Sequence, residues 1–181
     1  MVKDILVIGT GISGLTFAIK VAEENPKLSL TLISKMDINE GNTKYAQGGI
    51  AVVQNLKKDS TEKHIQDTLD AGDGACDSEV VKFVVEEANE RLDELIQWGA
   101  AFDKKKEKFD LGIEGGHSEK RIVHYKDQTG KQIQEVLTAK VKSLPNVVIL
   151  ENHTLVDLIT DHHSKSKMKR CYGAYVISQE K

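Results

Sequence analysis

The sequence GTGISG, from Gly9 to Gly14, is the feature that most constrains the fold of this chain. It follows the short apolar run Asp4–Ile8, which is typical of a strand buried on both faces. A G-x-G-x-x-G pattern between a strand and a helix permits a tight turn, close approach of the backbone to a pyrophosphate, and close packing of the helix. The pattern therefore predicts a nucleotide-binding turn at a helix N-terminus, with a merely structural turn as the alternative.

The residues after this motif predict the rest of a βαβ unit. A helix is predicted over Gly14–Glu24, and Asn25 ends it because Pro26 disfavours helical geometry in the residue before it. A second buried strand is predicted at Leu28–Ile33, joined to the first by a right-handed crossover. The helix is expected to bury the apolar face formed by Leu15, Ala18, Ile19 and Ala22.

Three further helices are predicted from apolar residues at helical spacing. One spans about Thr61–Ala71 with Asp59 or Ser60 as its cap. The next begins at Asp77 or Ser78 and stops near Gly99, and its expected buried face is Val80, Val81, Val84, Ala88, Leu92, Leu95 and Ile96. The last covers Gln128–Leu144, with an apolar stripe of Ile133, Val136, Leu137, Val141 and Leu144.

The remaining segments are short strands and one run of charge. The lysine-rich run Lys104–Lys108 is interpreted as a solvated hairpin or loop. Strands are predicted at Val147–Leu150, Leu155–Thr160 and Tyr172–Ile177. The stretch Val176–Lys181 leaves the last strand without an evident partner, so the sequence is expected to be the front part of a longer protein.

The end of the second strand lacks the acidic residue that often bonds a ribose about 20 positions after the glycine motif. Ser34 and Lys35 stand there, and they suit a ribose hydroxyl and a phosphate respectively. The same pair suits the 2′-phosphate of NADP, so a nicotinamide-dependent oxidoreductase stays open. An exposed strand end without a ligand is the other alternative.

Composition excludes several classes of function. With 39% hydrophobic and 29% charged residues and a net charge of -3, the chain is expected to fold without a basic field for nucleic acid or anionic membranes. No apolar run approaches the roughly 20 residues of a membrane span, and the N-terminus lacks a signal-peptide layout. Cys76 and Cys171, like His117 and His124, match no metal spacing, so no metal site and a cytoplasmic, reducing location are expected.

The loop NTKYAQGGI, from Asn42 to Ile50, departs from an ordinary nicotinamide-binding domain, which would continue with another βα unit. Its adjacent glycines, Gly48 and Gly49, let main-chain amides approach a flat ring or a phosphate. We expect this loop to return beside the first glycine motif.

Six segments in order resemble the flavoprotein family that contains L-aspartate oxidase and the flavoprotein subunits of succinate dehydrogenase and fumarate reductase. They are GTGISGL, LISK, EGNTKYAQGGIAVV, DTLDAGDGACD, WGAAFD and EGGHSEKRIVHYKDQTG. The last is the most specific, because the succinate and fumarate enzymes carry a different sequence there. The resemblance implies an α/β fold: a Rossmann-like FAD-binding βαβ unit with inserted helices and a terminal β-meander, apparently truncated. It divides the chain into 1–55, the dinucleotide-binding unit and flavin loop; 56–128, the helical and substrate-loop segment; and 129–181, a helix and short strands.

The resemblance also implies FAD held without a covalent bond. The succinate and fumarate enzymes link FAD through a histidine near the start of the loop, and Asn42 stands at that position. For Tyr45 a packed aromatic and for Lys44 a solvated charge remain alternatives. The cofactor-binding residues implied are Gly9, Thr10, Gly11, Ile12, Ser13, Gly14, Ser34, Lys35, Asn42, Thr43, Lys44, Tyr45, Ala46, Gln47, Gly48, Gly49, Thr154 and Leu155.

The segment EGGHSEKRIVH, from Glu114 to His124, suits a dicarboxylic amino acid. Its adjacent cations, Lys120 and Arg121, could meet carboxylates, which arginine binds with two parallel hydrogen bonds. By resemblance, Glu114 orients the substrate amine, and an unpaired Glu114 would be costly if it were buried. His117 is a polar group of the substrate site, or else a surface or structurally bonded histidine.

The activity implied by the resemblance is oxidation of L-aspartate to iminoaspartate, with oxygen or fumarate as electron acceptor. That step begins de novo NAD biosynthesis through quinolinate and allows coupling to quinolinate synthase. The arginine taken as catalytic base has no counterpart in this chain, so the chain alone is expected to be poorly active. A succinate- or fumarate-type flavoprotein, an NADP-dependent oxidoreductase and a non-catalytic nucleotide-binding module remain alternatives.

Overall fold

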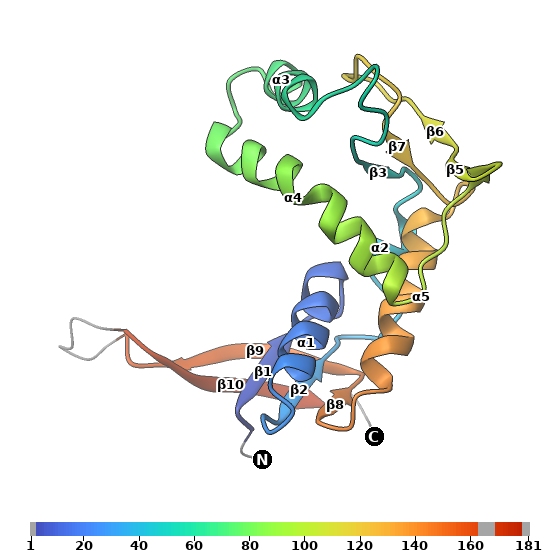
Figure 1. Cartoon of the computed structure of the whole chain (residues 1–181). Coiled ribbons are helices and arrows are strands. Elements are labelled where there is room, and N and C mark those ends of the chain that lie inside the picture. Colours follow the sequence, from blue (N-terminus) through green and yellow to red (C-terminus); the bar gives the residue numbers. More distant parts are fainter. Residues whose placement is uncertain (1–2, 163–168, 179–181) are drawn as a thin grey trace. The chain divides into compact units, whose positions relative to one another are not determined.

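The computed structural model describes residues 3–162 and 169–178, and it divides the chain into two compact units. The first unit combines Met1–Lys44 with Leu137–Lys181, so both ends of the chain contribute to it. The second unit is the continuous segment Tyr45–Val136. Figure 1 labels the elements of both units.

The first unit is built on a three-stranded parallel sheet. Strands β1 (Ile5–Ile8), β2 (Leu30–Ile33) and β8 (Val147–Leu150) lie in the order β1-β2-β8. The register pairs Ile5 with Leu30, and Leu30 with Val147. All four residues of β2 are buried, as its continuous apolar sequence predicts for a central strand. The strands expected from the sequence are confirmed.

Helix α1 (Ile12–Glu24) packs against this sheet with the face expected from its spacing. It ends where expected, because the Asn25 amide donates to the Val21 carbonyl and the next residue is proline. Asn146, just before β8, donates from its side chain to the carbonyls of Ala22 and Leu28, which ties the end of α1 to the sheet. The four buried residues of α1 are Leu15, Ala18, Ile19 and Ala22.

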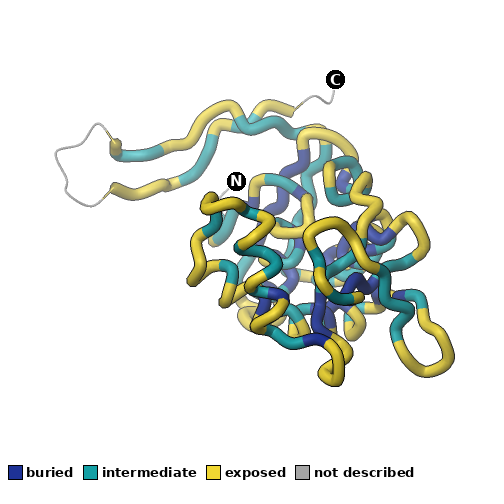
Figure 2. The backbone as a smooth tube through the Cα atoms, turned by 90° about the horizontal axis from the view of Figure 1, so that it is seen from above, coloured by how far each residue is buried: buried dark blue, intermediate teal, exposed yellow. Residues whose placement is uncertain are grey.

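The closing strands are confirmed as strands, but they do not form one meander. β8 joins the parallel sheet, whereas β9 (His153–Thr160) and β10 (Cys171–Ser178) pair with each other as an antiparallel hairpin. The reason is that β8 follows the crossover helix α5 (Thr129–Lys142) and therefore runs parallel to β2. Asn152, with a φ of +57°, then turns the chain into the hairpin. Figure 2 shows exposed and intermediate residues along that hairpin.

The last strand thus has a partner, in contrast to the expectation from Val176–Lys181. Val176 of β10 pairs with Leu155 of β9, and Ser178 pairs with His153. The rest of that stretch, residues 179–181, lies outside the described residues.

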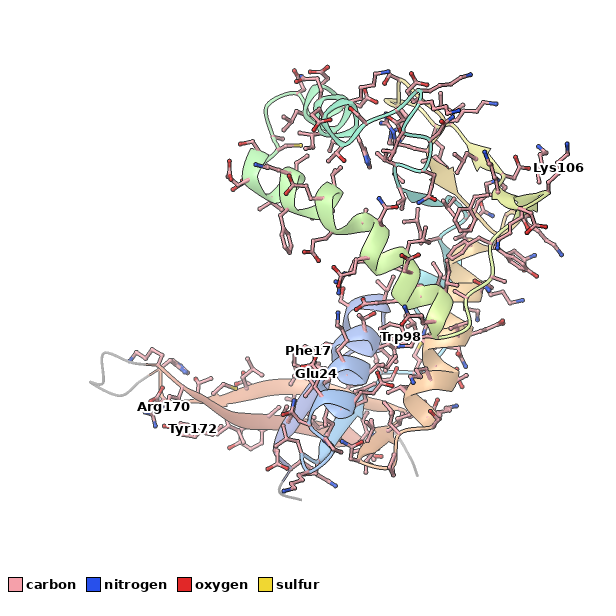
Figure 3. The ribbon with its side chains drawn as sticks, viewed as in Figure 1. Phe17, Glu24, Trp98, Lys106, Arg170 and Tyr172 are labelled. Atoms are coloured by element: carbon pink, nitrogen blue, oxygen red, sulfur yellow. The ribbon has the colours of Figure 1, made fainter. Side chains whose placement is uncertain are left out.

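The second unit contains a small antiparallel sheet and an exposed hairpin. The sheet has the order β3 (Ile50–Ala51), β7 (Ile122–Val123) and β6 (Leu111–Gly112). The hairpin pairs β4 (Lys104–Lys105) with β5 (Lys108–Phe109), which confirms the solvated hairpin expected from the lysine run. Lys106 at its tip has a φ of +59° and is labelled in Figure 3.

Two helices of the second unit begin at caps predicted from the sequence. In α3 (Thr61–Ala71) the cap is Ser60, whose side chain accepts from the Lys63 amide. In α4 (Ser78–Gln97) the cap is Asp77, whose carboxylate accepts from the two amides that follow Ser78. The other candidate cap of α3, Asp59, serves a different purpose described below.

The buried face of α4 differs from the predicted one. Val80 and Val84 are each 56% exposed, whereas Val85 is buried together with Leu92 and Leu95. Neighbouring residues on a helix point about 100° apart, so a stripe that follows Val85 leaves Val84 on the adjacent face. The sequence alone did not resolve this choice, because apolar residues occupy both positions.

A buried ion network fixes the long connection between β6 and β7. Arg121 is fully buried, and it donates to both oxygens of Asp59 over 2.7 and 2.9 Å and to Asp67 on α3 over 2.6 Å. Asp67 also accepts from the amide and the hydroxyl of Ser118. We call these side chains the Asp59–Arg121–Asp67 network. It ties the loop before α3, α3 itself and the segment around Ser118 together.

Replacing Gly14 with alanine is expected to destabilise the first unit. A Cβ at this position would lie 2.1 Å from the Gly9 carbonyl oxygen, which is backbone and cannot move aside cheaply. The expected loss in the free energy of unfolding is about 1–3 kcal/mol or more, measured by urea denaturation. Gly41→Ala is the control, since a Cβ there meets nothing within 4 Å. Equal stability of the two variants would contradict this account of Gly14.

Replacing Arg121 with methionine is expected to lower the free energy of unfolding by about 3–5 kcal/mol, because it leaves Asp59 buried without a counterion. The same denaturation measurement applies. Lys120→Met removes a neighbouring exposed charge and should change stability by less than about 0.5 kcal/mol. If both variants lose the same amount, the network does not stabilise the chain.

Candidate functional site

Two of the three motif glycines are required by the fold of the first unit. Gly9 has a φ of +103°, which favours glycine, and its amide donates to the Ile33 carbonyl at the end of β2. Gly14 lies against the Gly9 carbonyl oxygen, so α1 can approach the end of β1 only without a side chain there. These positions create the turn and do not themselves mark a ligand.

Gly11 is the motif glycine that internal packing does not require. Its φ is −71°, and an added Cβ would be in ordinary contact with the Thr43 hydroxyl at 3.6 Å. Gly11, Ile12 and Ser13 are exposed at the N-terminus of α1, and the cap residue Gly11 makes no side-chain hydrogen bond there. The exposed backbone at the positive end of a 13-residue helix is suited to a pyrophosphate.

The loop after β2 does return beside this motif, as expected. Thr43, in the short helix α2 (Asn42–Tyr45), accepts a hydrogen bond from the Ile12 amide over 3.0 Å. Asn42 is exposed next to it, and Lys44 forms an ion pair with Glu40 at 2.9 Å. Lys44 is thus bound to a neighbouring carboxylate and is not a simple solvated charge.

The end of β2 gathers several of the predicted cofactor residues. Ser34 is buried, accepts from the Thr10 hydroxyl over 3.0 Å, and donates from its amide to the Leu150 carbonyl at the end of β8. Its own carbonyl accepts from the amide of His153, the first residue of β9, so Thr154 follows at the same edge. Ligands of open parallel sheets bind at this carboxyl edge. Lys35 is exposed there, and Leu155 pairs with Val176 of β10.

In the second unit, the two glycines of the loop have different surroundings. A Cβ at Gly49 would lie 2.4 Å from the Ile122 side chain and from the Val123 carbonyl, so Gly49 is required by packing against β7. A Cβ at Gly48 would lie 3.2 Å from a carboxylate oxygen of Glu114. The segment predicted to meet the flavin and the segment predicted to meet the substrate therefore come together at Gly48.

The other loop residues of the second unit are largely exposed. Tyr45 is 63% exposed, so the alternative of a packed aromatic is wrong. Ala46 and Gln47 are exposed, and the Ala46 carbonyl accepts from the Gly130 amide near the start of α5.

The turn that carries Glu114 also carries His117. The His117 amide donates to the Glu114 carbonyl over 3.3 Å, and Gly116 between them has a φ of +85°. Glu114 is exposed, so the desolvation cost considered for a buried carboxylate does not apply to it here. Within residues 3–162 and 169–178, no hydrogen bond or ion pair involves its carboxylate. A free carboxylate on an open turn can accept hydrogen bonds from an ammonium group.

Arg121 does not serve the role suggested by the sequence. The sequence makes Arg121 a candidate for binding a substrate carboxylate, but its side chain is fully buried. Its Nε and Nη2 groups, which would bind such a carboxylate, already donate to the two oxygens of Asp59. Lys120 is the exposed cation of the pair. Sequence reasoning missed Asp59 and Asp67 as the partners of Arg121.

The charges of the network are fixed by its hydrogen bonds. Burial opposes ionisation of Asp67, but donors from Ser118 and Arg121 outweigh it and lower the pKa of Asp67 to about 2. His64 on α3 is buried, and its ring lies 5.6 Å from that of His117. Burial, and then the charge of Arg121, lower the pKa of His64, which therefore stays neutral near pH 7.

The described part of the chain offers neither a metal site nor a membrane-spanning helix. No group of three or more histidine, cysteine, aspartate or glutamate side chains is placed to hold a metal ion. None of the described helices is long and apolar enough to cross a membrane.

Several curated relatives are similar to this chain over almost its whole length. Among curated relatives, an L-aspartate oxidase of Yersinia pestis is 41% identical, covering 99% of this chain and 34% of the relative. One from Vibrio cholerae is 42% identical over 96% of this chain, and a chloroplastic one from Arabidopsis thaliana is 40% identical over 97%. This chain spans about one third of the length of the bacterial relatives and 26% of the Arabidopsis relative.

Solved flavoprotein structures have the same fold over this region. A variant of E. coli quinol fumarate reductase FrdA matches 97% of this chain and 29% of its own with a TM-score of 0.89 at 27% identity. The Mycobacterium smegmatis Sdh1 complex matches 98% of this chain and 31% of its own with a TM-score of 0.87 at 28% identity. The family model described as FAD binding domain matches residues 4–181. The α/β fold class expected from the sequence is confirmed, and the chain belongs to the FAD binding domain family.

Proposed function

We propose that this chain supplies the FAD cradle and part of the substrate site of an enzyme that oxidises L-aspartate to iminoaspartate. The observation that carries the proposal is the contact between Gly48 and Glu114, which brings a free carboxylate against the loop expected to face the flavin. The relatives at about 40% identity support the same activity. Those relatives are about three times as long as this chain.

The residues of the first unit fit a dinucleotide cofactor. The exposed backbone at Gly11 and Ser13, beside the Ile12 amide that Thr43 accepts from, would hold the pyrophosphate. The carboxyl edge around Ser34 and Lys35 would hold the ribose. When bound, FAD supplies the two-electron acceptor for the oxidation of the substrate. Asn42 at the position of the covalent histidine supports non-covalent binding. The other implied residues, including Thr154 and Leu155, remain part of this proposal.

In the second unit, Glu114 would accept hydrogen bonds from the substrate ammonium group, which succinate lacks. Lys120 is an exposed cation on the same connection. Within the proposal, the electron acceptor is oxygen or fumarate, and the product enters NAD biosynthesis with coupling to quinolinate synthase. Free Cys76 and Cys171 are compatible with the reducing cytoplasm proposed as its location.

A succinate- or fumarate-type activity is the second candidate, because structures of those enzymes have the same fold. The sequence EGGHSEKRIVH favours aspartate, since it places a carboxylate where a dicarboxylate without an amine would be repelled. The identity of about 40% to L-aspartate oxidases, against 27–28% to the two structures, points the same way.

FAD titration of the purified 181-residue chain tests the cofactor. We expect Gly11→Ala to weaken FAD binding at least about tenfold, because its methyl group would occupy the open backbone, while the free energy of unfolding stays within about 0.5 kcal/mol. Gly41→Ala is the matched control and should bind as the unchanged chain does. Acid precipitation should release the flavin into the supernatant. Undiminished binding by the Gly11 variant, or flavin retained in the pellet, would contradict the proposed cradle.

The response of the bound flavin spectrum to ligands tests the substrate. L-aspartate should perturb the spectrum at lower concentrations than succinate does. Glu114→Gln should weaken the aspartate response by up to about fivefold, because it removes an exposed carboxylate–ammonium pair worth about 1 kcal/mol. Glu119→Gln, on the same connection but paired with Lys63, is the control. Equal responses to the two ligands would instead favour the succinate-type activity.

A further inference from the structure

The hydrogen bonds of Arg121 determine which nitrogen of His117 carries a proton. A guanidinium group has five N–H donors and no acceptor. In Arg121, Nε and Nη2 donate to Asp59, and Nη1 donates to Asp67. Nη1 also lies 3.1 Å from Nδ1 of His117. Because arginine can only donate, Nδ1 must be the acceptor and must carry a lone pair.

We infer that Arg121 holds His117 as the neutral tautomer with its proton on Nε2, so that the ring presents a hydrogen-bond donor to a substrate carboxylate and does not act as a base. Arg121 is thus a positioning residue that acts through His117. The identity of the acceptor rests on the proposed function, whereas the tautomer rests only on the contacts of the second unit.

The network prevents Arg121 from turning away from His117. Three of its hydrogen bonds end on carboxylates, and Asp59 is itself held by the Ser60 amide over 2.9 Å. The residue next to His117, Ser118, donates both its amide and its hydroxyl to Asp67. His117 is therefore anchored through its ring and through its neighbour in sequence.

The surroundings of the ring place a donor, and no acceptor, against Nδ1. The groups that face it are Arg121, with its fixed positive charge, and His64, which is buried and neutral. Both negative charges nearby, on Asp59 and Asp67, are already engaged by Arg121. A proton on Nδ1 would replace a hydrogen bond with two donors facing each other. In the described residues, no hydrogen bond involves Nε2, which leaves this donor available.

Nitrogen-15 NMR of the labelled 181-residue chain tests the tautomer directly. Long-range proton–nitrogen correlations, assigned to His117 by their loss in His117→Gln, should show an unprotonated Nδ1 and a protonated Nε2 near pH 7. Arg121→Lys keeps the positive charge but replaces the planar guanidinium group by an ammonium group, so we expect a mixture of tautomers. A proton on Nδ1, or a mixture already present in the unchanged chain, would overturn the inference whatever the Arg121 variant shows.

Ligand binding tests the donor role separately. The amide nitrogen of glutamine can replace Nε2 as a donor, so His117→Gln should keep the L-aspartate affinity of the FAD-loaded chain within about threefold, whereas His117→Ala should weaken it at least about tenfold. FAD affinity should be the same in both variants. Equal losses in both variants would overturn the donor role. If the unchanged chain binds FAD but no aspartate, the proposed function fails while the NMR result still decides the tautomer.

Discussion

The close contact between Gly14 and the Gly9 carbonyl group determines how near α1 comes to the end of β1. Without a side chain at Gly14, the helix begins directly above the turn, and its first amides lie at the carboxyl edge of the sheet. One of those amides, from Ile12, is bound by Thr43, which brings the loop after β2 to the same place. The proposed pyrophosphate site is therefore a consequence of how tightly a helix and a strand pack, and Gly11 adds no side chain to it.

The second unit buries the Asp59–Arg121–Asp67 network at a position where an apolar cluster would carry a smaller desolvation penalty. Burying Arg121 with Asp59 and Asp67 carries a desolvation penalty that hydrogen bonds only partly offset, so such networks are weak evidence for stability. The network fixes the orientation of the side chains around it. Its donors and acceptors have fixed angles, and they orient Ser118 and His117 in a turn that also carries Glu114. An apolar cluster of the same volume would hold the turn in place without fixing the proton on His117.

Most of the fold could be predicted from the sequence where one local pattern decides it. The spacing of Leu15 and Ala18 defines the buried face of α1, and Ser60 and Asp77 define where two helices begin. The errors occur where two patterns are equally good. In α4, Val84 and Val85 are both apolar, and only packing selects Val85. The pairing of β8 with β2 joins residues more than a hundred positions apart, and no local feature encodes it.

The candidate site shows the same limit more sharply. A glycine motif indicates an open backbone, but it does not say which glycine serves packing and which serves a ligand; the surroundings of Gly49 and Gly48 separate the two. Likewise, the sequence suggests that Arg121 is available to a substrate, whereas in the structure it is hydrogen-bonded to Asp59, 62 residues away. Glu114 carries this reasoning one step further. A carboxylate–ammonium pair in water is worth only about 0–1 kcal/mol, too little to separate aspartate from succinate strongly. Because Glu114 is exposed, the role proposed for it would require that water be excluded from its carboxylate when substrate binds.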